Sequence, residues 1–112
     1  MSRILITGGA GYIGSHTAVE LMQAGHEVVI VDNLCNSSIQ VLDRLEQLCG
    51  PRFHFVQADV RDGAALDQIF AGHSIDGVIH FAGLKAVGES VAQPVRYFDN
   101  NVGSTLALLQ AM

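Results

Sequence analysis

Thr7-Gly8-Gly9-Ala10-Gly11-Tyr12-Ile13-Gly14 is the stretch that decides the fold. It follows the apolar run 4–6 and opens a segment, roughly 12–24, with the pattern of a helix. Its glycines satisfy both the G-x-G-x-x-G and the G-x-x-G-x-x-G spacing. Glycine permits a sharp turn off a strand, close approach of a phosphate to the backbone, and tight packing of the new helix on the strand. The stretch therefore predicts a phosphate-binding turn at the amino end of a helix.

A second signal is the acid that closes the next apolar run, 28–31. Asp32 stands where a carboxylate accepts hydrogen bonds from both hydroxyls of an adenosine ribose. The same carboxylate would repel a 2′-phosphate, and no Arg or Lys lies between Asp32 and Asp43 to neutralise one. The pattern predicts NAD rather than NADP. The alternative is a glycine-rich turn that binds nothing.

The rest of the chain repeats a strand–helix unit. Strands are expected over 3–7, 27–31, 53–57 and 77–81, and each is followed by a helical pattern. Gly25 suits the end of the first helix and Asp62 the N-cap of the third. The last helix begins near Pro94, with an apolar stripe formed by Val95, Phe98, Val102, Leu106 and Leu109. Right-handed crossovers then predict an α/β, Rossmann-type doubly wound parallel sheet with strand order 3-2-1-4, helices on both faces and a ligand crevice between strands one and four.

Composition limits the function classes. The chain has 112 residues, is 49% hydrophobic and carries a net charge of -5, which fits one globular domain. No basic block supports nucleic-acid binding, and no apolar run approaches the roughly 20 residues of a membrane span. The two cysteines, Cys35 and Cys49, form neither a disulfide framework nor a metal spacing. We expect a cytoplasmic protein with no nucleic-acid, membrane or metal partner.

Further candidates follow the third and fourth strands, whose carboxyl ends face the same crevice. Asp59 is expected to accept from the adenine amine while Val60 packs on the ring; the alternative for Asp59 is a helix-start acid. Phe81 and the small residues after it offer room for the middle of the cofactor, and Lys85 could reach its ribose or phosphates, although a loop lysine is usually only solvated. Asn100 could turn inward or belong to a polar face. His80 is expected to be a hydrogen-bonded core histidine rather than a ligand.

Three motifs resemble the sugar-nucleotide epimerases of the extended short-chain dehydrogenase/reductase family. They are the glycine stretch, Asp32-Asn33-Leu34-Cys35-Asn36-Ser37, and His80-Phe81-Ala82-Gly83-Leu84-Lys85-Ala86-Val87-Gly88-Glu89-Ser90, and Asp99–Thr105 extends the match. The resemblance implies an isomerase in which bound NAD takes a hydride from C4 of a UDP-hexose and returns it to the opposite face, interconverting UDP-glucose and UDP-galactose. Together with the glycines, the cofactor contacts expected are Gly8, Gly11, Tyr12, Ile13, Gly14, Asp32, Asn33, Leu34, Cys35, Asn36, Ser37, Asp59, Val60, Phe81, Ala82, Gly83, Leu84, Lys85 and Asn100.

The chain departs from that family in one respect. The family's Tyr-x-x-x-Lys pair is missing, because His16 stands four residues after Tyr12 and Asn101 four after Tyr97. We therefore expect residues 1–112 to be the amino-terminal part of an NAD-binding domain, with later strands and the substrate domain absent, no catalytic residue, and no turnover alone. Two alternatives are a sugar-nucleotide 4,6-dehydratase and a non-catalytic dinucleotide-binding module. An open edge at strand four predicts self-association, as a homodimer or through swapped elements.

Overall fold

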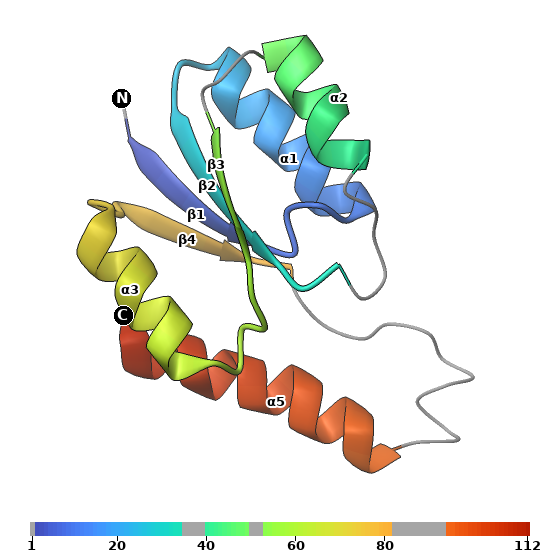
Figure 1. The fold of residues 1–112 in the computed structure, drawn as a ribbon, viewed down its shortest axis with the longest axis vertical. Coiled ribbons are helices and arrows are strands. Elements are labelled where there is room, and N and C mark those ends of the chain that lie inside the picture. Colours follow the sequence, from blue (N-terminus) through green and yellow to red (C-terminus); the bar gives the residue numbers. More distant parts are fainter. Residues whose placement is uncertain (1, 35–39, 50–52, 82–93) are drawn as a thin grey trace.

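The computed structural model describes residues 2–34, 40–49, 53–81 and 94–112 (Figure 1). Strands and helices alternate along the chain, as the sequence predicts. In order they are β1 (Arg3–Thr7), α1 (Tyr12–Gln23), β2 (Glu27–Asp32), α2 (Gln40–Cys49), β3 (Phe53–Gln57), α3 (Gly63–Gly72), β4 (Gly77–His80) and α5 (Pro94–Ala111).

The four strands form one parallel sheet in the order β3-β2-β1-β4, which confirms the predicted winding (Figure 1). Two strand ends differ by one residue from expectation. β2 continues to Asp32, which pairs with Gln57, and β4 ends at His80, which pairs with Thr7. The Phe81 N–H still donates to the Thr7 carbonyl at 2.9 Å, so the backbone hydrogen bonding between β4 and β1 continues one residue beyond the last strand pair.

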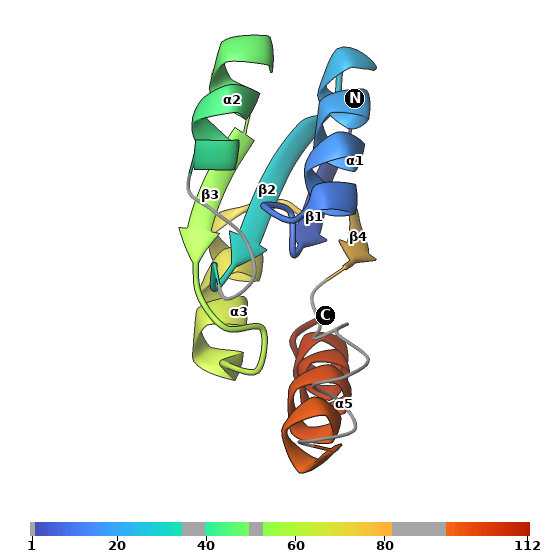
Figure 2. The same ribbon diagram turned by 90° about the vertical axis from the view of Figure 1, so that its right-hand side faces the viewer.

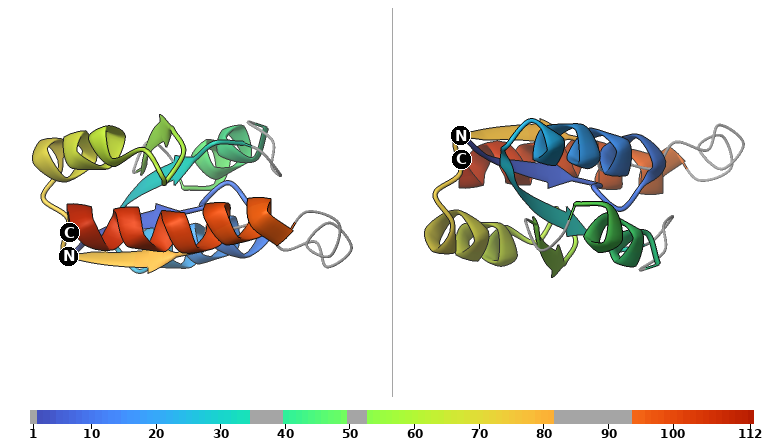
Figure 3. Two further views of the ribbon diagram at one scale, coloured as in Figure 1. Left: turned by 90° about the horizontal axis from the view of Figure 1, so that it is seen from below. Right: turned by 90° about the horizontal axis from the view of Figure 1, so that it is seen from above.

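Helices cover both faces of the sheet, α1 and α2 on one and α3 and α5 on the other (Figures 2 and 3). Alternate residues of each strand supply the two cores. Ile6, Val28 and Ile30 pack with α1 and α2, whereas Leu5, Val29 and Val31 pack with α3 and α5. This double burial explains why the central strands are apolar almost throughout.

The predicted helix ends are found in the structure. Asp62 is the N-cap of α3, and its side chain accepts from the Ala65 N–H at 3.3 Å. Gly25 follows the C-cap residue Ala24 of α1 with a φ of 94°, a conformation that glycine adopts without strain. The chain therefore turns directly from α1 into β2.

Four residues of the apolar stripe expected on α5 are exposed, and the side chain of the fifth, Phe98, lies outside what the structure describes. Leu106 is 56% and Leu109 62% exposed, and Val95 and Val102 are exposed as well. Leu108, only 4% exposed, and Ser104 are buried instead. The reason is that α3 and the sheet cover one side of α5, and the periodic stripe lies outside that contact. No helix within the described ranges is both long and apolar enough to cross a membrane.

A candidate dinucleotide-binding site

The turn after β1 is closed by its own backbone. Gly8 has a φ of 70°, in the left-handed region, and its N–H donates to the Val31 carbonyl at 2.8 Å. The Gly11 N–H then donates back to the Gly8 carbonyl at 3.1 Å. These bonds pin the turn to the end of β2 and direct the chain into α1. A side chain at Gly8 would strain that conformation, so glycine is required there.

Gly14 and Gly9 are needed for close packing. A Cβ added at Gly14 would overlap the Gly8 carbonyl oxygen and lie 2.9 Å from the Gly9 Cα. A Cβ at Gly9 would lie 2.6 Å from Cγ2 of Ile30, in the middle of β2. The glycine pattern therefore lets the first turn of α1 rest directly on the strand-to-helix turn, which is the arrangement that the spacing predicts.

The amino end of α1 is open. Gly11 is the N-cap and supplies no side chain to accept from the first helical N–H groups, and the first turn contains no acid. Tyr12 is 82% and Ile13 55% exposed, so solvent reaches this end of the helix. Unpaired N–H groups and the positive end of the helix dipole favour an anion. A bound diphosphate would supply acceptors for the first helical N–H groups, which have no side-chain cap.

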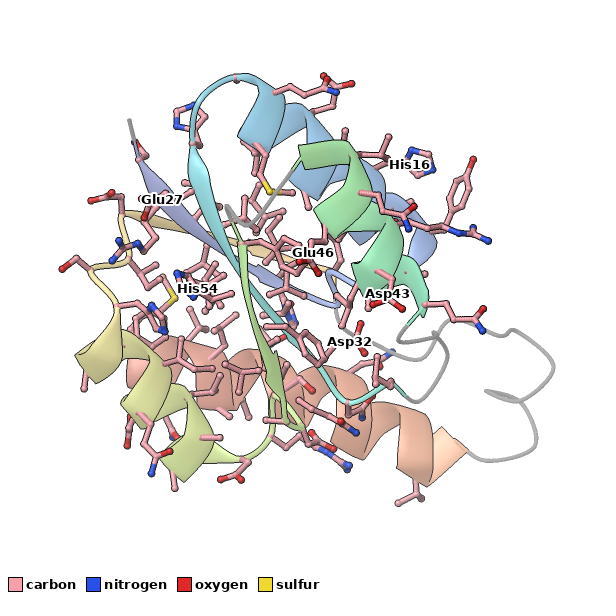
Figure 4. All side chains as sticks on the ribbon, turned by 45° about the horizontal axis from the view of Figure 1, so that its top comes forward. His16, Glu27, Asp32, Asp43, Glu46 and His54 are labelled. Carbon is pink, nitrogen blue, oxygen red and sulfur yellow. The ribbon has the colours of Figure 1, made fainter. Side chains whose placement is uncertain are left out.

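Asp32 points toward this turn. It is only 8% exposed, its Oδ2 accepts from the Ala10 N–H at 3.1 Å, and its Oδ1 accepts from the Leu34 N–H at 2.7 Å. Figure 4 shows Asp32 at the carboxyl end of β2, whereas Glu27 and His54 lie toward the opposite end of the sheet. A carboxylate at the end of the second strand of this fold is the group that accepts from the hydroxyls of an adenosine ribose.

The segment after Asp32 is held in an uncommon backbone conformation. Leu34 has a φ of 61°, a region that residues other than glycine, asparagine and aspartate rarely adopt. The bond from its N–H to Asp32 holds the local turn. Such outliers persist where the surroundings hold them, and they cluster at ligand sites.

Asp59, after β3, is held by a neighbouring arginine. Nη2 of Arg61 lies 2.7 Å from its Oδ2 and Nε 3.0 Å from its Oδ1, and the Arg61 backbone N–H also donates to Oδ1 at 2.8 Å. The Arg61 hydrogen bonds lower the pKa of the Asp59 carboxyl below its ordinary value, with burial opposing them and Asn33 adding a smaller lowering effect. Asp59 is therefore an ionised acceptor, suited to an amine such as that of adenine.

Val60 lies next to Asp59 but in the core. Its side chain is 4% exposed and packs with Leu5, Val31 and Leu66. The predicted contact of Val60 with an adenine ring stays a prediction.

The structure describes only some of the remaining residues that were predicted to contact the cofactor. Phe81 is half-buried and packs on the side of the sheet that carries α1 and α2. Asn100 lies in α5, and its side chain is outside what the structure describes. Also outside the described residues are Cys35, Asn36, Ser37, Ala82, Gly83, Leu84 and Lys85.

Two groups that hydrogen-bond to the acids of the candidate site were not predicted from the sequence. Arg61 clamps Asp59, and the backbone of Ala10 donates to Asp32. An arginine two residues after an acid is common on any surface, so the sequence carries no specific signal for the clamp. The Ala10 bond arises from backbone, which sequence patterns do not mark.

Together, the parallel order β3-β2-β1-β4, the glycine turn and the acid after β2 define a Rossmann-type dinucleotide-binding fold. Comparison with known proteins gives the family. A family model described as GDP-mannose 4,6 dehydratase matches residues 5–112. UDP-glucose 4-epimerase of Neisseria meningitidis serogroup B is 59% identical over the whole chain, which spans 33% of that protein. The Klebsiella pneumoniae sequence of the same name is 57% identical, and the chain covers 79% of it. The chain therefore belongs both to the family that this model describes and to the family of UDP-glucose 4-epimerases.

Solved structures of UDP-glucose 4-epimerases have the same fold as this chain. The epimerase of Stenotrophomonas maltophila, with bound NAD and formylated UDP-arabinopyranose, superposes with a TM-score of 0.96 at 53% identity. That of Bifidobacterium longum, in complex with NAD+ and UDP, gives a TM-score of 0.97 at 53% identity. Each match covers at least 99% of this chain and 33% of the other protein. The chain thus spans about a third of the length of these relatives.

Proposed function

We propose that this chain is the NAD-binding part of an enzyme that interconverts UDP-glucose and UDP-galactose. The observation that carries the proposal is the open amino end of α1 beside a carboxylate, Asp32, that points at the same turn. The relatives support it, because epimerases with this fold contain NAD. The residues present fit the cofactor: amides for an anion, and a carboxylate for a ribose diol.

Within this site each group has a separate task. The amides that open α1 at Tyr12, Ile13 and Gly14 would hold the diphosphate, and Asp32 the adenosine ribose. Asp59, kept ionised by Arg61, would accept from the adenine amine. The remaining contacts proposed from the resemblance are the glycine turn itself together with Gly8, Gly11, Asn33, Leu34, Cys35, Asn36, Ser37, Val60, Phe81, Ala82, Gly83, Leu84, Lys85 and Asn100.

When bound, NAD supplies the acceptor and donor of hydride for C4 of the hexose. These 112 residues bind and orient it, but neither tyrosine is followed by a lysine at the fourth position. A phenol with a lowered pKa is needed to move the proton of the sugar hydroxyl. We therefore propose that the acid–base pair is supplied outside residues 1–112, and that this stretch alone does not turn over.

The test is an assay of the intact protein with UDP-galactose, in which UDP-glucose formation and bound NAD are both measured. We expect turnover by the intact protein and none by residues 1–112. Turnover by residues 1–112 would contradict the proposed division of labour. Absence of turnover by the intact protein, with NAD present, would contradict the epimerase assignment and favour a non-catalytic dinucleotide-binding module.

A 4,6-dehydratase is the enzymatic alternative, and the family model that matches carries that description. The identity of 57 to 59% with epimerases over nearly the whole chain favours epimerisation. Mass spectrometry of the product separates the two, because a dehydratase releases water and epimerisation conserves mass. A product lighter by one water would overturn the assignment.

We also propose that the protein forms a homodimer or otherwise self-associates. β4 has one partner, β1, in the described sheet, and the α5 stripe of Val102, Leu106 and Leu109 is exposed. Apolar faces and open edges of this kind associate with another chain. Light scattering at increasing concentration tests this, and Leu106→Gln should weaken association. A monodisperse monomer at high concentration would contradict it.

The activity would place the protein in galactose metabolism. A cytoplasmic location fits the two cysteines, which lack the pattern of a disulfide framework. Immunodetection in fractionated cells would test the location.

A further inference from the structure

His80 lies between two elements of the fold. It ends β4 and is half-buried on the face that carries α5. Its Nδ1 lies 2.5 Å from Oγ1 of Thr7, the last residue of β1. Its Nε2 lies 3.3 Å from Oγ1 of Thr105 in α5. One imidazole therefore connects the end of β1 to the helix that covers it.

The direction of these hydrogen bonds follows from the threonine in α5. The Thr105 hydroxyl donates its only hydrogen to the Asn101 carbonyl, at 3.1 Å. Toward His80 it is then an acceptor, so Nε2 of His80 carries the proton. In a neutral imidazole Nδ1 is left as an acceptor, and it takes the proton of the Thr7 hydroxyl. The result is a directed chain from Thr7 through His80 and Thr105 to the Asn101 carbonyl.

The chain connects three segments that bear on the cofactor site. Thr7 immediately precedes Gly8 of the glycine turn, and His80 immediately precedes Phe81. Thr105 lies in α5, where its hydroxyl donates to the carbonyl of Asn101, the residue next to Asn100. We propose that His80 is a positioning residue, which sets α5 and Phe81 relative to the phosphate-binding turn. The proposal rests on the proposed NAD site, and it gives His80 no contact with the cofactor.

The first test is the protonation of the ring, measured on the intact protein labelled with ¹⁵N-histidine at about pH 8, above the ordinary histidine pKa. We expect His80 to show a protonated Nε2 and an unprotonated Nδ1. Thr105→Val removes the acceptor and should shift this balance toward protonated Nδ1. Thr105→Ser keeps the hydroxyl and should behave as the wild type. Thr17→Val is the matched control, since Thr17 makes the same bond to the carbonyl four residues back without touching His80.

The second test asks whether a change at Thr105 or His80 alters the glycine turn and the affinity for NAD. Thr105 is exposed, so Thr105→Val leaves the core intact, and any effect does not reflect failed folding. It should shift the amide resonances of Gly8 and Gly11 and raise the Kd for NAD about fivefold, equivalent to about 1 kcal/mol. His80→Gln, whose single amide group cannot replace both ring nitrogens at their separate positions, should raise the Kd at least as much.

The outcomes separate this inference from the proposed function. If the wild type does not bind NAD, the proposed function fails, and the amide resonances still decide the coupling: movement supports it and no movement overturns it. If the wild type binds NAD and both variants bind it equally well, the positioning role is overturned. A protonated Nδ1 with an unprotonated Nε2 in the wild type would overturn the directed chain.

Discussion

The Oδ2 atom of Asp32 lies 3.1 Å from the backbone nitrogen of Ala10 and accepts its N–H. This bond joins the acid after β2 to the glycine-rich turn after β1, although the two residues are far apart in the chain. It holds a mostly buried carboxylate beside the open amino end of α1. The groups proposed for the ribose and the diphosphate of NAD are thus fixed relative to each other before any ligand arrives.

Replacing Asp32 with Asn should weaken both the cofactor site and the fold. The amide has one acceptor oxygen, so either the Ala10 or the Leu34 N–H loses its partner, at a cost of about 1–3 kcal/mol. Loss of the charge should also raise the Kd for NAD about tenfold or more. Urea unfolding and calorimetric titration measure the two effects. Asp43→Asn, at an exposed acid on α2, is the control and should cost less than about 1 kcal/mol. Equal behaviour of the two variants would contradict the role given to Asp32.

Gly14→Ala should destabilise the protein by about 1–3 kcal/mol, because the new methyl group overlaps the Gly8 carbonyl and the turn must move. NAD binding should fall with it, since the displaced turn carries the amides. Thermal unfolding compared with Gly63→Ala provides the measurement. A Cβ at Gly63, in the first turn of α3, meets nothing within 4 Å, so that variant should be neutral or slightly more stable. An undisturbed Gly14→Ala protein would show that the turn is looser than described.

Arg61→Met should raise the pKa of the Asp59 carboxyl toward its ordinary value, because the Arg61 hydrogen bonds are the main cause of its lowering. A lowered carboxyl pKa adds stability that is present above the unfolded-state value and is lost as the pH falls through the folded-state value. The variant should therefore lose less stability on acidification than the wild type. Carboxyl ¹³C resonances followed through a pH titration report the shift. An unchanged Asp59 titration would contradict the assignment of the lowered Asp59 pKa to Arg61.

His73 should make the fold sensitive to mild acid. Burial lowers the pKa of its imidazole, and the positive charges of His54 and Arg3 lower it further. The His54 ring lies 5.2 Å away, centroid to centroid. The unfolded chain then binds a proton at a higher pH than the folded one, so this stability is complete above the unfolded-state pKa and is lost as the pH falls toward the folded-state value. Urea midpoints near neutral pH and about two units lower should differ less in His73→Gln than in the wild type. A difference of the same size in both proteins would contradict the assignment to His73.

Most of the architecture could be predicted from local patterns. The strands, the caps at Asp62 and Gly25, and the glycine turn each depend on residues close together in the chain. The strand order follows from the right-handed crossovers that join parallel strands. The exposed stripe of α5 was not predicted, because periodicity identifies an apolar face without identifying what covers it. The clamp of Asp59 by Arg61 is local, but an arginine two residues after an acid is too common to predict it. The position of the Val60 side chain in the core depends on tertiary packing, which local patterns do not specify.

The most direct test of the central claim is to follow backbone amide resonances of the intact protein while NAD is added. We predict that the largest changes fall on Tyr12, Ile13 and Gly14 at the start of α1 and on Leu34 beside Asp32, and that Asp32→Asn shifts the titration to higher NAD concentration. Saturable NAD binding that leaves these amides unmoved, or no binding at all, would contradict the account.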